Sequence, residues 1–210
     1  MCGIAGWVGL NSLNQGIFDR KLQAVKRMIQ LQNHRGPDAN GVFEDRKCNV
    51  IFGHNRLSIL ELSDAGAQPM FDQSKNWVIS YNGELYNYQK IKQELIERFS
   101  VKFRGNSDTE AVLYGVIHFG IDEFLRKADG MFAFAIYNRS RREVFLARDR
   151  VGEKPLYFFK SKEGLSFASE LKVLGESFDG NLGIDTTGLQ LYLILRYVPP
   201  PYTILSGISK

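Results

Sequence analysis

The residue best placed to do chemistry in this sequence is the cysteine at position 2. Methionine aminopeptidases remove an initiator methionine when the second residue is small, so we expect Met1 to be cleaved and Cys2 to become the N-terminus. The α-amine of such a cysteine has a pKa of about 7.7–8.0 and is partly neutral near pH 7, so it can accept the thiol proton. Cys2 would then supply both the nucleophile and its base. On its own, a cysteine at this position is most simply an accident of sequence.

The second cysteine and the three histidines suggest no further reactive group. Cys48 lies in the apolar run 48–52, where a small buried hydrophobic side chain is expected. The histidines, His34, His54 and His118, have no metal-ligand spacing with either cysteine. We therefore expect no metal site. We also expect no structural disulfide in a chain that lacks a secretory signal.

The elements that must hold Cys2 follow from hydrophobic periodicity. The apolar stretch 3–9 predicts a buried strand, and apolar residues at helical spacing from Phe18 to Ile29 predict a helix after it. The near-continuous apolar run 131–137 is typical of a strand covered on both faces. Strands occur in groups with helices between the groups, which argues against a Rossmann fold and for two packed sheets with helices outside. The other predicted strands lie at about 41–45, 49–57, 77–81, 144–147, 156–159 and 165–168, and the other helices are marked by Ile91, Leu95 and Phe99 and by Val112, Leu113, Val116 and Ile117.

The composition excludes several classes of function. The net charge is only +4, and the one tight basic group, at 139–142, is better explained as a solvated turn between two strands than as a nucleic-acid site. No run of 18 apolar residues occurs, and no basic segment followed by a long apolar stretch begins the chain. We therefore expect no nucleic-acid partner, no membrane partner and a cytoplasmic location.

The last part of the sequence has a different character. Residues 185–197 predict a new amphipathic helix, and Pro199-Pro200-Pro201 follows it. We expect residues 1–182 to form one domain. Residues 183–210 would be a linker and the first elements of a second, truncated domain. The oligomeric state is left open, with a homodimer as one option.

Short motifs along the whole chain resemble those of class II glutamine amidotransferases, and among these the asparagine synthetase (glutamine-hydrolysing) branch. Each motif alone is modestly specific, whereas their occurrence in one order is a strong signal. The motifs are Cys2-Gly3-Ile4-Ala5-Gly6, His34-Arg35-Gly36-Pro37-Asp38, Gly53-His54-Asn55-Arg56-Leu57-Ser58-Ile59, Gly66-Ala67-Gln68-Pro69-Met70, Tyr81-Asn82-Gly83-Glu84-Leu85-Tyr86-Asn87, Ser107-Asp108-Thr109-Glu110, Asp129-Gly130-Met131-Phe132-Ala133 and Arg148-Asp149-Arg150-Val151-Gly152-Glu153-Lys154-Pro155-Leu156-Tyr157.

The resemblance implies a fold and a reaction. The fold is α+β, a four-layer αββα sandwich of two mainly antiparallel sheets, as in N-terminal-nucleophile hydrolases. The reaction is hydrolysis of L-glutamine to L-glutamate and ammonia through a thioester on Cys2. The ammonia would pass to the protein's own C-terminal synthetase domain, which uses ATP and Mg. No cofactor is expected in the glutaminase domain, because the Ser-Gly-Gly-x-Asp-Ser nucleotide loop is absent from these residues.

The resemblance also implies roles for individual residues. Arg56 would bind the α-carboxylate of glutamine with its guanidinium fork, and Asp108 would bind the α-ammonium. The Asn82 side-chain amide and the Gly83 backbone N–H would form the oxyanion hole. The further substrate-binding residues are Leu57, Ile59, Leu60 and Glu84, with Leu60 standing where the family often has valine.

Structural explanations compete with some of these roles. Asn82-Gly83 is also a typical hairpin turn, although the helical spacing of Ile91, Leu95 and Phe99 soon after it weakens this interpretation. The glycine could serve both turn and oxyanion hole. Ser107 and Glu110 fit a capping box around Asp108. Three residues of the second motif, His34, Arg35 and Asp38, are expected to hold the loop near the N-terminus. The residues Asp149, Arg150 and Lys154 of the last motif could equally form a buried ion-pair network between the sheets.

Alternative functions remain at this stage. Sugar-phosphate and phosphoribosyl amidotransferases usually carry Thr-Arg-Trp-Ala-Thr near residues 55–59, so this sequence sides with the asparagine synthetase branch. If Met1 is retained, the α-amine of Cys2 is an amide, which favours a non-catalytic glutamine-binding or regulatory domain. The amide acceptor of the parent enzyme could be aspartate or a sugar acid.

Overall fold

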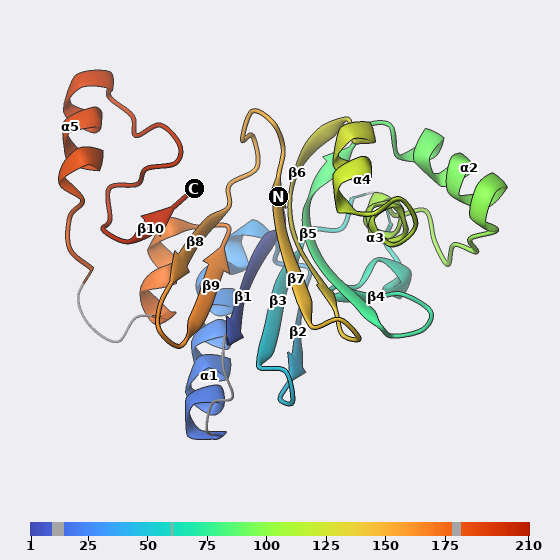
Figure 1. The fold of residues 1–210 in the computed structure, drawn as a ribbon, viewed down its shortest axis with the longest axis horizontal. Helices are drawn as coiled ribbons and strands as arrows, with labels where there is room; N and C mark the ends of the chain where they lie inside the picture. The colour runs from blue at the N-terminus through green and yellow to red at the C-terminus, as the bar shows by residue number, and fades with distance from the viewer. Residues whose placement is uncertain (10–14, 60, 178–181) are drawn as a thin grey trace.

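Two antiparallel sheets form the centre of the structure, a computed structural model that describes residues 1–9, 15–59, 61–177 and 182–210 (Figure 1). The first sheet has the order β10-β8-β9-β1-β3-β2, with β1 at Gly3–Gly9, β2 at Ala39–Asp45, β3 at Val50–Arg56, β8 at Tyr157–Lys160, β9 at Gly164–Ala168 and β10 at Ile208–Ser209. The second has the order β4-β5-β6-β7, with β4 at Met70–Phe71, β5 at Trp77–Leu85, β6 at Gly130–Asn138 and β7 at Glu143–Arg148.

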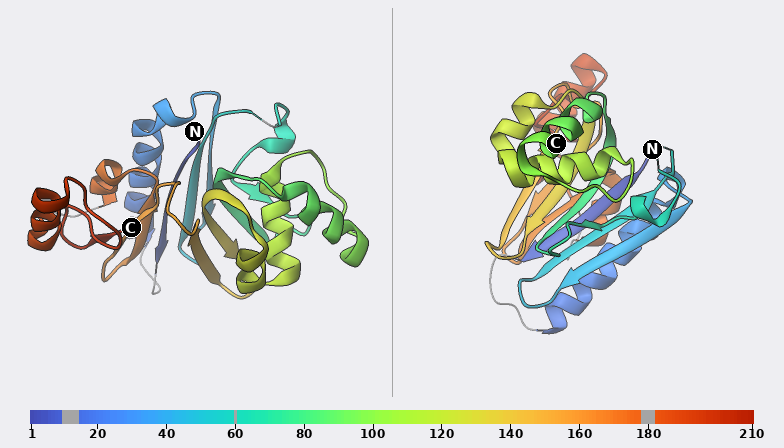
Figure 2. Two further views of the ribbon diagram at one scale, coloured as in Figure 1. Left: turned by 90° about the horizontal axis from the view of Figure 1, so that it is seen from above. Right: turned by 90° about the vertical axis from the view of Figure 1, so that its right-hand side faces the viewer.

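Helices cover the outer faces of both sheets. Seen from above, the layers follow one another as α1, the sheet of β1, the sheet of β5, and α3 with its neighbours (Figure 2, left). This is the predicted αββα sandwich. The helices are α1 at Gln15–Leu31, α2 at Tyr88–Phe99, α3 at Asp108–Phe119, α4 at Ile121–Lys127 and α5 at Thr186–Leu195, and the short 3-10 helices are η1 at Asn33–Arg35, η2 at Asp64–Gly66 and η3 at Leu171–Ser177.

The apolar core lies in three layers that match the alternation of side chains along the strands. Between the sheets, Phe52 of β3 meets Phe167 of β9 edge to face, with ring centroids 5.5 Å apart. Strand β6 contributes to two layers, because Ala133 and Ala135 face the other sheet while Phe134 packs under the helices. Both faces of β6 are therefore buried, as its continuous apolar run predicts. Full burial of a large apolar side chain stabilises the fold by about 1.5–3 kcal/mol.

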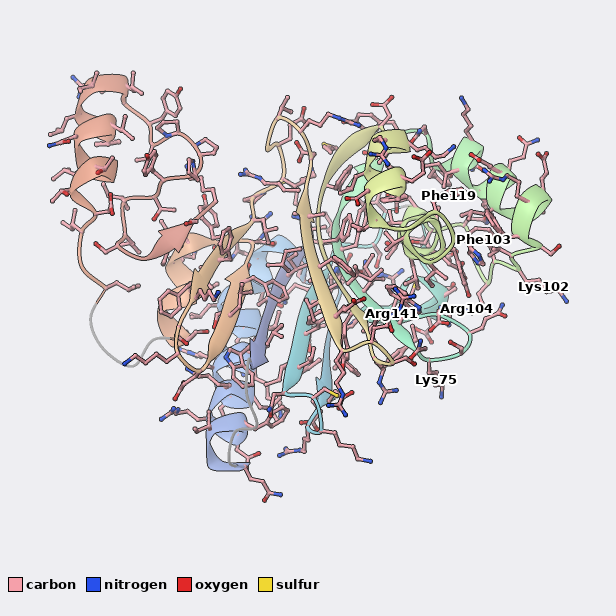
Figure 3. All side chains as sticks on the ribbon, in the orientation of Figure 1. Lys75, Lys102, Phe103, Arg104, Phe119 and Arg141 are labelled. Atoms are coloured by element: carbon pink, nitrogen blue, oxygen red, sulfur yellow. The ribbon has the colours of Figure 1, made fainter. Side chains whose placement is uncertain are left out.

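Several short elements were not predicted. Helix α4 has seven residues, and β4 and β10 have two each. Elements of this length do not develop a recognisable hydrophobic period. The basic group at 139–142 is confirmed as an exposed turn between β6 and β7. Arg141 of this turn lies at the same end of the molecule as Lys75 and Arg104 (Figure 3).

The last residues contain α5 and a strand that returns to the first sheet. Ile208 of β10 pairs with Phe159 of β8, and its side chain is buried in the core beneath α1. Helix α5 is apolar yet exposed, with Leu193 62% and Ile194 76% accessible. The division at 182/183 stays a prediction. None of the helices in the described ranges is long and apolar enough to cross a membrane.

Candidate active site

A cavity of about 200 Å³ opens where β1, β3 and β5 meet the start of α3. Every predicted site residue that the structure describes lines it, and Leu60 lies outside the described residues. In the described ranges, no group of three or more His, Cys, Asp or Glu side chains could hold a metal ion. The predicted residues in the lining are Cys2, Arg56, Leu57, Ile59, Asn82, Gly83, Glu84 and Asp108.

Cys2 is half-buried directly before β1, and the backbone of Leu57 holds its sulfur. The Leu57 N–H donates to Sγ at 3.4 Å, and the thiol faces the Leu57 carbonyl at 3.8 Å. Burial raises the pKa of the Cys2 thiol, although the hydrogen bond from Leu57 and the positive N-terminus oppose this. A thiol with a raised pKa is mostly protonated near pH 7, so it needs a base before it can attack.

The loop around η1 fixes the backbone of Cys2. The Arg35 Nε donates to the Cys2 carbonyl at 3.0 Å, and Arg35 Nη1 lies 3.4 Å from a carboxylate oxygen of Glu170. The same carboxylate lies 2.7 Å from Nε2 of His34. Asp38 accepts a hydrogen bond of 2.7 Å from a backbone N–H in the loop after β3. These contacts agree with the structural roles predicted for the three motif residues.

The edge of β5 that faces the cavity is covered by side chains. Strand β4 pairs only with the first part of β5, at Val78 and Ile79. Beyond it, the Tyr81 N–H donates to Oε1 of Gln68 at 2.7 Å, and the Tyr81 carbonyl accepts from Nε2 of His54 at 3.0 Å. Further along, the Leu85 N–H donates to Oδ2 of Asp108 at 3.0 Å. Side chains therefore take over the hydrogen bonds that a longer neighbouring strand would make.

Gly83 lies between these covered positions and turns its N–H toward the cavity. Gly83 pairs with Phe132 of β6. The N–H and the carbonyl of Phe132 both bond to Asp149, on the side of β6 away from β5, at 3.3 and 2.8 Å. Because alternate residues of an antiparallel strand bond to opposite neighbours, the Gly83 N–H points away from β6. The side-chain Nδ2 of Asn82 is also buried, with no partner in the described part of the chain. Two hydrogen-bond donors thus face the cavity that holds Cys2.

The competing interpretation of Asn82-Gly83 as a hairpin turn is wrong, because both residues lie inside β5 and pair with β6. The glycine is needed for packing. A Cβ at Gly83 would lie 2.5 Å from the Met131 carbonyl oxygen and 2.7 Å from Cα of Phe132. The site requires glycine here because β6 approaches too closely for a side chain.

His54 connects the two sheets beside these donors. It is fully buried, and this burial lowers its pKa to about 4, so the ring is neutral at pH 7. A neutral ring that donates from Nε2 to the Tyr81 carbonyl leaves Nδ1 without a proton, and Nδ1 has no partner among the described residues. This role was not predicted. The sequence signal that could have indicated this role is the two-residue spacing between His54 and Arg56, which places both side chains on one face of β3.

Opposite charges face the cavity from two walls. Arg56 ends β3, is 8% accessible, and donates from Nη2 to the Glu61 carbonyl. Asp108 begins α3, and its Oδ2 accepts from the Tyr81 hydroxyl at 2.9 Å. Burial raises the pKa of Asp108, while the bonds from Leu85, Tyr81 and the backbone of α3 lower it. A ligand with both a carboxylate and an ammonium group would find a partner for each.

The predicted capping box before α3 is only half right. The Ser107 hydroxyl accepts from the Thr109 N–H at 3.1 Å, as an N-cap does. The buried carboxylate of Glu110, however, accepts from the backbone N–H groups of Arg104 and Gly105, at 3.1 and 3.2 Å. Glu110 therefore fixes the loop before the helix instead of closing the box.

The ion-pair network considered as an alternative for Asp149, Arg150 and Lys154 is not formed, since no ion pair joins these three in the ranges that the structure covers. Asp149 accepts from the Lys154 N–H at 2.9 Å, and Arg150 donates to the Ala128 carbonyl at 2.9 Å. The Lys154 ammonium instead lines the cavity, 3.6 Å from the sulfur of Met1. Backbone groups thus partner the charged side chains of Asp149 and Arg150, whereas the Lys154 ammonium lies in the cavity.

The site thus places a cysteine at the start of a strand in an αββα sandwich, in a cavity lined by Asn82, whose Nδ2 has no partner among the described residues, and by Gly83. The family model of the glutamine amidotransferase domain matches residues 1–210, so the chain belongs to this family. The predicted family and fold are confirmed.

Individual relatives agree with this membership. The chain is 37% identical to asparagine synthetase [glutamine-hydrolyzing] 1 of Bacillus subtilis, over 100% of the chain and 32% of that protein. It is 39% identical to asparagine synthetase B [glutamine-hydrolyzing] of Escherichia coli, over 76% of the chain and 29% of that protein. The structure of glutamine phosphoribosylpyrophosphate amidotransferase from B. subtilis superimposes with a TM-score of 0.67 at 22% identity, over 83% of this chain and 43% of that one, which shows a shared fold. The chain spans about a third of the length of these curated relatives.

Proposed function

We propose that this domain hydrolyses L-glutamine to L-glutamate and ammonia through a thioester on Cys2, once Met1 has been removed. The observation that carries the proposal is the position of the Cys2 sulfur in a cavity with two donors, Asn82 Nδ2, which has no partner among the described residues, and the Gly83 N–H, which points away from β6. Donors of this kind stabilise the negative oxygen that forms when a nucleophile attacks an amide, and removing one typically costs a factor of about 10²–10³ in kcat.

The reaction begins with proton transfer from the Cys2 thiol to its own neutral α-amine. The thiolate attacks the side-chain amide carbon of glutamine, and the former carbonyl oxygen becomes an oxyanion bound by Asn82 and Gly83. The intermediate collapses and the C–N bond breaks. The leaving nitrogen takes the proton from the α-ammonium group of Cys2 and departs as ammonia. Water, deprotonated by the same amine, then attacks the thioester. Glutamate leaves and the thiol regains its proton.

Charges at the cavity wall would hold the substrate. Arg56 binds the α-carboxylate and Asp108 the α-ammonium, and both groups are buried where such contacts are strong. Leu57, Ile59 and Glu84 contribute to the wall around the substrate, and Leu60 is proposed from the resemblance alone.

Removal of Met1 has a second consequence. Met1 lines the cavity, and its carbonyl blocks the amine of Cys2 as an amide. Cleavage therefore frees space and creates the base in one step. A chain that retained Met1 would keep the binding groups without this base.

We further propose that the ammonia serves an ATP-dependent synthetase domain of the parent protein, which would supply the ATP and Mg sites. Support comes from the relatives, which are named asparagine synthetases and of which the chain spans about a third. The acceptor carboxylate is aspartate in this proposal. A sugar acid is the alternative acceptor.

The test of the proposed nucleophile is ammonia release from glutamine by the Cys2→Ala variant, with Cys48→Ala as the matched control. We expect no activity above background in the first and near-normal activity in the second, because Cys48 packs against the core between the sheets and does not line the cavity. Substantial ammonia release by Cys2→Ala, with its fold intact by circular dichroism, would refute the assignment.

A further inference from the structure

Tyr81 is a buried residue of the cavity wall that the proposed reaction does not use. Its side chain is 2% accessible and packs in the core between the second sheet and its helices. Its hydroxyl donates to Oδ2 of Asp108 at 2.9 Å, and the same oxygen accepts from the Leu85 N–H at 3.0 Å. Two donors on one oxygen fix the rotation of the carboxylate. An ionised carboxylate has about four acceptor positions, so capacity remains for a ligand.

Tyr81 is itself held rigidly, which lets it act as a support. Its N–H donates to Gln68 and its carbonyl accepts from His54, at 2.7 and 3.0 Å. Its main chain is thus tied to the loop before β4 and to the opposite sheet, while its side chain reaches α3. A side chain fixed at both ends holds a carboxylate with little freedom to move.

The hydroxyl also favours the charged form of Asp108. Burial raises the pKa of this carboxyl, and the hydrogen bonds from the Leu85 N–H and the Tyr81 hydroxyl lower it. Only the ionised carboxylate attracts an ammonium group strongly. Orientation and charge of Asp108 therefore both depend on the phenol.

We propose that Tyr81 is the positioning residue for the α-amino group of the substrate, which acts through Asp108 and makes the domain prefer an α-amino acid amide to the same amide without the amine. This inference rests on the proposed function, in which Asp108 binds the ammonium. Tyr81 does not touch the reacting atoms in this account.

The experiment compares two substrates, L-glutamine and glutaramate, which is glutamine without its α-amino group. In Tyr81→Phe the ring is retained and only the hydroxyl is lost. We expect kcat/KM for glutamine to fall about tenfold, mainly through KM, because one charge-assisted contact is weakened. The value for glutaramate should change less than twofold. Asp108→Asn should lower kcat/KM for glutamine at least as much while changing the value for glutaramate little, and the double variant should lose little more than Asp108→Asn alone.

Tyr137→Phe is the matched control. Its hydroxyl also donates to a buried carboxylate, that of Asp45 at 3.4 Å, but in the core between the sheets and outside the cavity. This variant should leave the ratio of the two kcat/KM values unchanged. Equal losses on both substrates in Tyr81→Phe, or no loss on either, would overturn the inference.

Protection of Cys2 against iodoacetamide separates this inference from the proposed function. If the wild-type chain releases no ammonia from glutamine, the proposed reaction fails. The inference still holds if glutamine protects Cys2 at lower concentration than glutaramate does and this advantage shrinks in Tyr81→Phe. An advantage that is absent in the wild type, or that persists in Tyr81→Phe, would contradict it.

Discussion

The proposed nucleophile is a thiol whose surroundings favour its protonated form. Burial raises the pKa of Cys2, and the Leu57 N–H that points at the sulfur only partly offsets this effect. A base close to the sulfur is therefore needed, and the freed α-amine of the same residue is the base we propose. We assign a different role to the charged residues of the cavity, which in the proposed reaction hold the substrate against the thiol.

The first prediction concerns this substrate contact. Arg56→Lys keeps the charge but loses the two-pronged geometry, and Asp108→Asn keeps the size but loses the charge. Each should lower kcat/KM for glutamine roughly ten- to a hundredfold, as expected for about 1.5–3 kcal/mol. Because the pair also orients the amide, kcat should fall while KM rises.

The controls for these two changes are Arg141→Lys and Asp122→Asn, which alter exposed residues away from the cavity. Both should behave as the wild type does. A small thiol reagent should still modify Cys2 in all four variants. Normal kcat/KM in Arg56→Lys and Asp108→Asn would show that the substrate is held elsewhere, and a loss of thermal stability equal to the loss of activity would favour a purely structural role.

Strand β5 is the element on which the site depends, and the sequence predicted it incompletely. Its apolar start, residues 77–81, has a clear strand pattern, whereas Asn82-Gly83 is locally indistinguishable from a turn. What keeps β5 extended is the contact with β6, from a distant part of the chain. The same limit applies to Glu110, whose partners in the preceding loop cannot be read from helix-cap rules.

The prediction for β5 is that Gly83→Ala destabilises the fold. The added methyl group would meet the Met131 carbonyl oxygen at 2.5 Å, a backbone atom that cannot move without displacing β6. Overpacking of this kind costs about 1–3 kcal/mol. Urea unfolding should therefore give a lower midpoint, together with reduced activity as the Gly83 N–H, the proposed oxyanion donor, shifts.

Gly175→Ala serves as the control, because the nearest atom that a Cβ there would meet, among the residues the structure describes, is a Leu182 methyl carbon at 3.9 Å. It should unfold at nearly the wild-type midpoint. Equal stability of Gly83→Ala and the wild type would show that β6 can move away, and the packing argument for glycine would be wrong.

The whole molecule could be predicted better than its details. The order of strand and helix patterns predicted two packed sheets with helices outside. The continuous apolar run of β6 predicted a strand with both faces buried, as the structure shows. The contact between the two sheets could not be predicted in this way. His54 makes part of this contact, and its hydrogen bond to Tyr81 depends on how one sheet sits on the other.

His54 leads to a prediction about pH and stability. The pKa of His54 is about 4 in the folded protein, below the ordinary histidine value of 6.5 that applies to the unfolded chain. Between these values the unfolded chain binds a proton that the folded one does not, so stability falls as the pH is lowered from 6.5 toward 4. The full effect is about 3 kcal/mol. His54→Gln, which keeps a donor near the Nε2 position, should reduce this slope in urea unfolding.

His118→Gln is the comparison, since burial lowers the pKa of this less buried ring only modestly. It should change the slope less than His54→Gln does. If the wild type and His54→Gln lose stability in parallel from pH 6.5 to 4, His54 is not the group that titrates.

The central claim is that Cys2, freed of Met1, is the nucleophile. The most direct test is intact-mass and peptide analysis of the chain after treatment with a diazo-ketone analogue of glutamine. The account predicts a mass without Met1, one adduct per chain on Cys2 and none on Cys48, and slower labelling when glutamine is present. A chain that retains Met1 yet hydrolyses glutamine at the normal rate, or labelling mainly at Cys48, would contradict it.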